Sequence, residues 1–97
     1  MAFARLAFFP DGTAEHYDAL AAEVGNEGVA PDGRLVFAAG QAPGGWQVVQ
    51  VWTSYEALEA FNAEVFFPAM ERLGAAAFPE VPVVVDFEPS DLQVTPG

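Results

Sequence analysis

The segment from Gly44 to Phe61 constrains the fold of this chain more than any other part. It begins with a glycine pair, continues through the β-prone run from Trp46 to Trp52, and passes without a linker into an apolar pattern after Ser54. Aromatic and β-branched residues favour a strand, and a serine directly before a pattern of helical period is typical of a helix N-cap. A strand that enters a helix this abruptly predicts a compact α/β protein.

Turn residues divide the rest of the chain. Proline–aspartate–glycine turns at 10–12 and 31–33 and the hairpin turn Ala42-Pro43-Gly44-Gly45 separate apolar runs that favour strands. We expect strands at residues 2–9, 34–40, 45–53 and 81–88. Pro82 lies inside the last of these ranges, and it predicts an edge position because proline cannot donate a hydrogen bond to a neighbouring strand.

Two segments have the apolar spacing of an amphipathic helix. The first is expected to begin at Thr13 and to end at Gly25 and Gly28, and the second to begin at Ser54. Pro68 predicts a further helical turn or a kink, with Gly74 as the stop. The apolar faces comprise Tyr17, Leu20, Ala21 and Val24 in the first helix and Leu58, Phe61, Asn62 and Val65 in the second.

The predicted order is βαββαβ over a single domain, residues 1–97. Two βαβ-type halves joined by a hairpin form a four-stranded antiparallel sheet with both helices on one face, which is the ferredoxin-like α+β fold. The strands do not alternate apolar and polar residues: Leu6 and Phe8 point away from Ala7 and Phe9, yet all four are apolar. Two helices cover one face only, so we expect a homodimer in which a second sheet covers the other. The tail, residues 89–97, is expected to contact the partner.

The charge balance argues against several classes of partner. The net charge is −11, from 14 acidic residues and three arginines, with no lysine. Such a chain is repelled by nucleic acid and by anionic membranes, and its acids, mostly on the predicted helices, are read as a solvated surface. The absence of cysteine excludes disulfides and thiolate chemistry. No apolar run approaches the roughly 20 residues of a membrane span, and the N-terminus lacks the pattern of a secretion signal. We therefore expect a cytoplasmic protein.

The sequence resembles the dimeric α/β-barrel superfamily, in particular its small antibiotic-biosynthesis-monooxygenase-like proteins. The resemblance rests on Gly12-Thr13-Ala14 at the start of the first helix and on the segment from Val51 to Phe61. It implies the ferredoxin-like fold, a homodimer and, in some members, cofactor-free oxidation of polyketide-derived phenols. Other members degrade haem. The haem-degrading pattern of Asn, Trp and His meets Arg5, Phe61 and Glu71 here, so haem degradation is not expected and no cofactor is predicted.

Asn62 and Arg5 are polar residues inside apolar patterns, where an unpaired polar atom is unfavourable. Asn62 either caps a backbone group or lines a pocket between helix and sheet and holds a substrate oxygen. Arg5 either pairs with Asp86 or Glu88 on the last strand or anchors a phenolate, enolate or carboxylate.

Aromatic and amide side chains supply the remaining candidates. Trp46, Gln50 and Trp52 share one strand face, which is either core or the wall of a pocket for a flat ligand. The predicted substrate-binding residues are Tyr17, Gln50, Trp52, Phe61 and Phe66. His16 is either solvent-exposed or the general base, because only its side chain titrates near neutrality. One histidine and scattered carboxylates give no metal-ligand spacing.

Three functions remain open at this point. The first is a cofactor-independent enzyme of secondary metabolism that oxidises or cyclises an aromatic or polyketide-like molecule, with His16, Asn62 and Arg5 as its catalytic residues. The second is a small-ligand-binding protein without turnover, and the third is a stress-related dimeric module whose interior is packed shut. A cavity between the second helix and the sheet would favour the first two, and a base close to that cavity would favour the enzyme.

Overall fold

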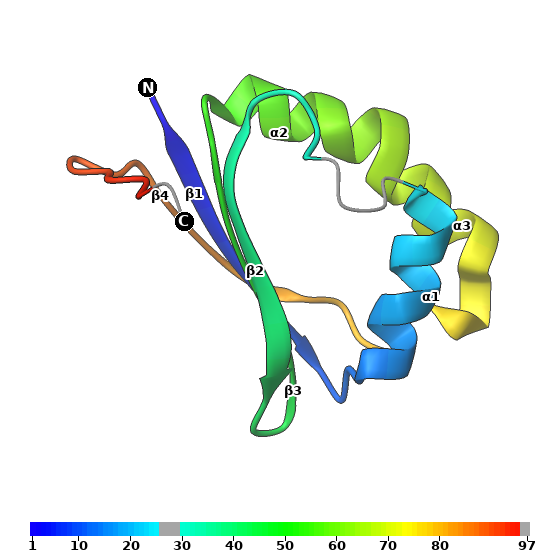
Figure 1. Ribbon diagram of the computed structural model, residues 1–97. Helices are drawn as coiled ribbons and strands as arrows, with labels where there is room; N and C mark the ends of the chain where they lie inside the picture. The colour runs from blue at the N-terminus through cyan, green and yellow to red at the C-terminus, as the bar shows by residue number, and fades with distance from the viewer. Residues whose placement is uncertain (26–29, 96–97) are drawn as a thin grey trace.

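A curved sheet carries all the helices on one side (Figure 1). The computed structural model describes residues 1–25 and 30–95. The strands are β1 (Phe3–Pro10), β2 (Arg34–Ala42), β3 (Gly45–Trp52) and β4 (Val83–Phe87). The helical segments are α1 (Ala14–Val24), α2 (Tyr55–Phe61), the π-helix η1 (Asn62–Phe66), α3 (Phe67–Leu73) and the 3₁₀ turn η2 (Gly74–Ala76). The predicted βαββαβ order is confirmed, with α2, η1 and α3 together as the second helix.

The four strands are antiparallel and lie in the order β2-β3-β1-β4. This is the ferredoxin-like arrangement, because the first and third strands are central and the hairpin partner and the last strand form the edges. β4 is an edge strand as predicted, although Pro82 lies just before it rather than within it. In the register, Arg5 faces Gln50 on one side and Asp86 on the other. Three polar side chains from three strands therefore meet in one row.

The predicted ends of the first helix are confirmed where the structure describes them. The Thr13 side chain accepts a hydrogen bond from the His16 backbone N–H, and the His16 ring accepts one from the Thr13 backbone N–H. This reciprocal capping box satisfies two N–H groups that the helix cannot pair itself. Gly25 ends the helix in the left-handed conformation, with φ 75°. Gly28, also predicted as part of this end, lies outside the described residues.

The hairpin turn between β2 and β3 follows from its glycines. Gly44 adopts φ 80°, which is the third position of the predicted type II turn after a proline. Gly45 is required for another reason: a Cβ atom there would lie 2.3 Å from the carbonyl oxygen of Phe9. The hairpin can therefore lie against β1 only with glycine at this position.

The second helix contains a π-helical turn that the sequence pattern did not predict. The Phe67 N–H bonds to the Asn62 carbonyl, five residues earlier, and Pro68 lies in the first turn of α3. Proline has no N–H, and its ring clashes with the carbonyl four residues before it. A π turn is a recognised way for a helix to absorb such an interruption. The helix therefore continues through Pro68 and ends at Gly74 as predicted.

Aromatic residues dominate the core between sheet and helices. Trp52 and Leu58 are fully buried. The Phe9 and Phe78 rings stack with centroids 4.1 Å apart. Ala7, Leu20, Trp46, Val48 and Ala69 complete the buried cluster. Both tryptophans of β3 are thus buried, on the face that the helices cover.

The opposite face of the sheet is apolar and lacks a helical cover. Val83, Val85 and Phe87 on β4 are 60%, 58% and 52% exposed, and Leu6 and Phe8 continue the same face on β1. Residues after β4 extend to the side of the sheet away from the helices (Figure 1). The prediction that both faces are apolar is confirmed. The homodimer that would cover this face stays a prediction.

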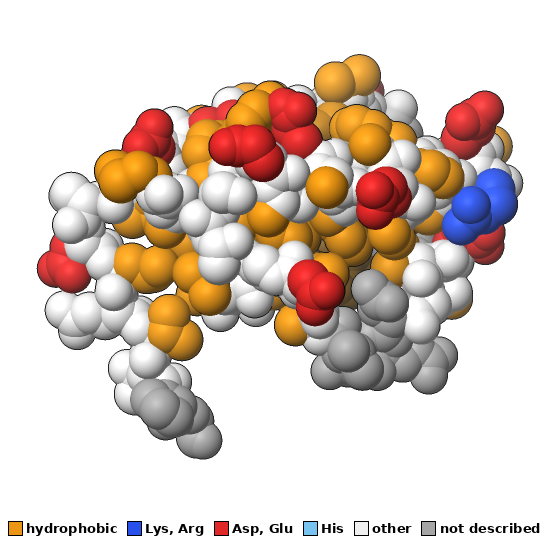
Figure 2. Space-filling view, turned by 90° about the horizontal axis from the view of Figure 1, so that it is seen from above, with side chains coloured by type: hydrophobic (Ala, Val, Ile, Leu, Met, Phe, Trp, Pro, Cys, Tyr) orange, Lys and Arg blue, Asp and Glu red, His pale blue; other side chains and the backbone are white. Residues whose placement is uncertain are grey.

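Acidic side chains are spread among apolar ones on the α2 side of the molecule rather than gathered in one patch (Figure 2). This distribution suits a solvated surface. Within the described residues, no helix is both long enough and apolar enough to cross a membrane.

Candidate functional site

A cavity of about 820 Å³ lies between the sheet and the helices. This volume falls within the range of small-molecule sites, roughly 300–1,000 Å³. Most of its lining is apolar, with aromatic rings contributed by β1, β2, α1, the second helix and Phe78. The polar residues of the lining are Arg5, Tyr17, Asp18, Arg34, Gln50 and Asn62. A mostly apolar space with a few polar groups is what a site for an aromatic molecule requires.

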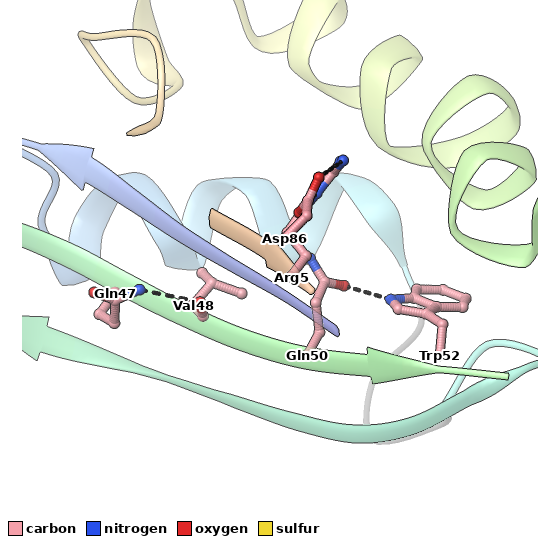
Figure 3. A network of polar contacts seen from close by, with 6 residues as sticks. All are labelled: Arg5, Gln47, Val48, Gln50, Trp52 and Asp86. Atoms are coloured by element: carbon pink, nitrogen blue, oxygen red, sulfur yellow. Dashed lines mark hydrogen bonds and ion pairs between the residues drawn. The ribbon is translucent and has the colours of Figure 1, made fainter. Parts of the chain in front are cut away.

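Gln50 lies in the cavity wall, and Trp52 supports it from behind. The Trp52 Nε1–H donates to Gln50 Oε1 at 2.8 Å, and both side chains project from β3 on the same side (Figure 3). This bond uses the oxygen of the amide, so the Gln50 NH₂ group is the end left for a ligand. Trp52 was predicted to bind substrate directly, but the residue is fully buried and absent from the cavity lining.

Arg5 reaches the cavity but is already paired. Its Nε and Nη2 atoms donate to the two carboxylate oxygens of Asp86 at 2.8 and 2.9 Å, as Figure 3 shows. The Asp86 hydrogen bonds raise the pKa of Arg5 above its ordinary value, so the side chain stays charged. Of the two alternatives weighed for Arg5, the ion pair with Asp86 is confirmed. Its positive charge is therefore largely offset at the cavity wall.

Arg34 enters the same cavity from the start of β2, and within residues 1–25 and 30–95 it forms no ion pair like that of Arg5. The Nε atom is buried and has no hydrogen-bond partner in the part of the chain that the structure describes. The guanidinium lies over the Phe37 ring, with Cζ 4.2 Å from the ring centroid. Burial lowers the pKa of Arg34 from its ordinary value, but an arginine so shifted is still a cation near neutral pH.

Tyr17 supplies a hydroxyl from α1. Its ring stacks on Trp46 with centroids 5.1 Å apart, which holds it against the sheet. Burial raises the pKa of the Tyr17 phenol, while the nearby Arg34 cation acts in the opposite direction. The hydroxyl therefore stays protonated near neutral pH and can donate a hydrogen bond into the cavity.

Asn62 lies at the point where α2 becomes the π-helix, and it lines the cavity together with Phe61 and Phe66. In a π turn the side chains fall out of the normal helical spacing, and such turns occur often at functional sites. Phe61 also packs on Trp52, with ring centroids 5.4 Å apart. The second helix thus contributes one amide and three aromatic rings, those of Phe61, Phe66 and Phe67, to the site.

His16 is placed elsewhere. Its Nδ1 atom accepts the Thr13 backbone N–H at 3.1 Å, its ring lies near Phe78, and the residue is absent from the cavity lining. The structure thus uses His16 as a helix cap. Within the described residues, Asp18 is the carboxylate of the lining, and it is solvent-exposed.

Six of the eight predicted site residues meet at one cavity. They are Arg5, Tyr17, Gln50, Phe61, Asn62 and Phe66. Arg34 and Phe37 were not predicted, although Arg34 is one of only three arginines in the sequence. The available signal was an arginine at the start of a predicted strand, but its meeting with Phe37 depends on a register irregularity between Arg34 and Val36, which no sequence pattern marks.

A metal site has no geometric support in the described residues, where no group of three or more His, Asp or Glu side chains comes together.

Comparison with known proteins identifies solved structures that share this fold. No family model matches the chain, and no curated protein does so. Solved structures do match it. One is a candidate antibiotic biosynthesis monooxygenase from Chloroflexus aurantiacus, with 17% identity, a TM-score of 0.69, and coverage of 98% of this chain and 100% of that one.

Two further structures match, and only one of them carries a functional name. Another candidate antibiotic biosynthesis monooxygenase, from Caulobacter crescentus, is 16% identical with a TM-score of 0.73, covering 93% of this chain and 91% of that one. A protein of unknown function from Nitrosomonas europaea is 20% identical with a TM-score of 0.65, covering 99% and 93%. At such identities the likeness extends to the fold and not to the chemistry. The chain therefore has the ferredoxin-like fold of structures named as antibiotic-biosynthesis-monooxygenase-like proteins, as its sequence resemblance implied.

Proposed function

We propose that this protein is a cofactor-independent enzyme of secondary metabolism that oxidises or cyclises an aromatic or polyketide-like molecule. One observation carries the proposal: a cavity of about 820 Å³ with aromatic walls and a few inward polar groups. The names of the structural neighbours agree with the same class of chemistry.

The chemistry needs little from the protein once the substrate is an anion. A phenol or enol that loses its proton becomes electron-rich and can react with dioxygen directly. For an anthrone, the ring CH₂ group and one O₂ become a C=O group and one water, so atoms and electrons balance without a cofactor. The Gln50 and Asn62 amides can donate hydrogen bonds to the developing oxyanion, which would stabilise it.

Binding without turnover is the second candidate, and one observation favours it. The predicted base, His16, is absent from the cavity lining, and the carboxylate found there, Asp18, is exposed. Turnover would then require that the substrate bind already ionised, with water as the proton acceptor. A non-catalytic carrier needs no such step.

Oxygen consumption and binding separate these candidates. 1,8-Dihydroxyanthrone would serve as the probe, with uptake followed at an oxygen electrode and binding by quenching of tryptophan fluorescence. Asn62→Ala is expected to lower both, because it removes an amide from the cavity. Arg5→Ala should do so more weakly, because Arg5 is held by Asp86. Arg72→Ala is the matched control, since Arg72 pairs with Glu23 on the surface.

The combination of oxygen uptake and binding separates an enzyme from a carrier. Uptake that falls in Asn62→Ala and stays unchanged in Arg72→Ala supports an enzyme. Binding without uptake identifies a carrier. Neither binding nor uptake of the probe, or no change on replacing both Asn62 and Arg5, contradicts the assignment of this cavity as a functional site.

A further inference from the structure

We infer that the cavity selects planar aromatic ligands bearing an ionised oxygen, and that Arg34 binds this oxygen. The inference rests on the proposed function, because it concerns the same cavity, and it adds the charge state of the ligand and the residue that recognises it. Phenolates, enolates and carboxylates share the required chemistry.

Arg34 differs from the other two arginines in its partners. The chain has three arginines and no lysine. Arg5 is bound at both ends of its fork by Asp86, and Arg72 is paired with Glu23. In the described part of the chain, no carboxylate forms an ion pair with Arg34, and its Nε atom is buried without a hydrogen bond.

The buried Arg34 N–H group is energetically unfavourable without a partner. Removing an arginine N–H from water without replacing its hydrogen bond is unfavourable. An anionic ligand oxygen in the cavity would restore that bond as a charge-assisted one. A cation in the cavity matters more in a chain of net charge −11, because it offsets the long-range repulsion that an anion meets on approach.

The residues around Arg34 suit a planar ligand with a charged oxygen. The Arg34 Cζ atom lies over the Phe37 ring, 4.2 Å from its centroid, and this cation–π contact helps to hold the guanidinium in the cavity. Tyr17 faces the same space and keeps its hydroxyl proton, so it can donate a second hydrogen bond to the same oxygen. Phe37, Phe61 and Phe66 line the same cavity as these two donors, which suits a flat ring attached to the charged oxygen.

The test compares three ligands that differ in one group. 4-Nitro-1-naphthol can ionise and changes colour when it does, 1-nitronaphthalene lacks the hydroxyl group, and 4-nitro-1-naphthoate carries a carboxylate in its place. Each is titrated into the full-length wild-type protein, into Arg34→Gln, and into Arg72→Gln, which removes the same charge from the surface. Circular dichroism and thermal unfolding check that every variant is folded, and Arg34→Lys keeps the charge if Arg34→Gln fails to fold.

The expected result is a lowered apparent pKa of the bound naphthol, seen as naphtholate colour at a pH where the free dye is neutral. Arg34→Gln should abolish this shift and weaken naphtholate binding roughly tenfold to a hundredfold, the range for a hydrogen bond to a charged group. Binding of 1-nitronaphthalene should not change. If naphthoate binds and naphtholate does not, the oxygen recognised is a carboxylate rather than a phenolate.

Failure of this inference can be told apart from failure of the proposed function. If the neutral and ionised dyes bind equally, and Arg34→Gln changes neither affinity nor colour, the inference is wrong and the cavity is an uncharged aromatic site. If none of the ligands binds, both fail. If naphtholate binds through Arg34 but 1,8-dihydroxyanthrone consumes no oxygen, the inference holds and the oxidation does not.

Discussion

Both faces of the sheet are largely apolar, but the face under the helices also carries several polar side chains. The face that the helices cover carries Arg5, Arg34, Gln50 and Asp86, whereas the uncovered face of β4 presents Val83, Val85 and Phe87. Antiparallel sheets normally place polar residues on the open side. Polar groups under a cover imply something polar to bind there, and a large exposed apolar surface implies a partner. The covered face is thus suited to a ligand and the open face to protein association.

The largest expected effect tests whether the covered face holds the fold together. Trp52→Ala should lower the free energy of unfolding by about 3–5 kcal/mol, because the side chain is fully buried and also holds Gln50 in place. Urea denaturation followed by circular dichroism measures this. Val81→Ala, at a residue 84% exposed, should change stability by less than about 0.5 kcal/mol. Equal effects of the two substitutions would refute the core assignment.

The next prediction concerns the open face. If two protomers pack there, Val85→Asp places a charge in each copy of an apolar interface and should weaken the dimer about a hundredfold, or about 3 kcal/mol. Sedimentation equilibrium measures the dissociation constant. Val81→Asp adds the same charge outside β4 and should leave assembly unchanged. A wild-type protein that sediments as a monomer at all concentrations would rule out the dimer.

A smaller effect is expected at the Arg5–Asp86 pair. Its side chains are 21% and 34% exposed, so solvent screens the pair and Asp86→Asn should cost only about 0.2–1 kcal/mol of stability. The same substitution leaves Arg5 as a second unpaired cation at the cavity. Naphtholate should therefore bind several-fold more tightly, and high salt should reduce the gain. An unchanged affinity would mean that Arg5 does not face the bound anion.

The smallest effect is on alkaline stability. Burial raises the pKa of Tyr17, so the folded protein keeps the phenol proton at a pH where the unfolded chain, with a pKa of about 10, has lost it. This contribution is complete below that pH and declines as the pH rises through the folded-state pKa. Tyr17→Phe should flatten the fall in thermal midpoint above pH ~10.

Tyr55 provides the control for this measurement. Its pKa is also raised, by a hydrogen bond to Glu59, but on the exposed surface. Tyr55→Phe isolates its share, and the double variant should be flatter than either. A Tyr17→Phe protein with the same alkaline slope as wild type would show that Tyr17 is not buried in solution.

The arginines show how far the site could be predicted. Strand order alone brings Arg5 beside the last strand, so its pairing with Asp86 was among the expected alternatives and is confirmed. Arg34 could not be singled out in this way. Its stacking on Phe37 depends on the irregular register of β2 and its burial on how closely α1 approaches the sheet, and neither is a local property. His16 was chosen for its titration range, but capping geometry decides where it lies.

The sequence by itself determined the element order, the caps and the turns, because these depend on neighbouring residues: Thr13 and Ser54 begin helices, and Gly44 turns the hairpin. It also determined that both faces of the sheet are apolar enough to need a cover. Only the tertiary structure decided that a π turn at Asn62 accommodates Pro68, that Trp52 bonds to Gln50 instead of lining the cavity, and that the Arg34 Nε atom is buried without a hydrogen-bond partner among the described residues. These outcomes depend on packing between segments distant in the chain, where shape and burial outweigh local preference.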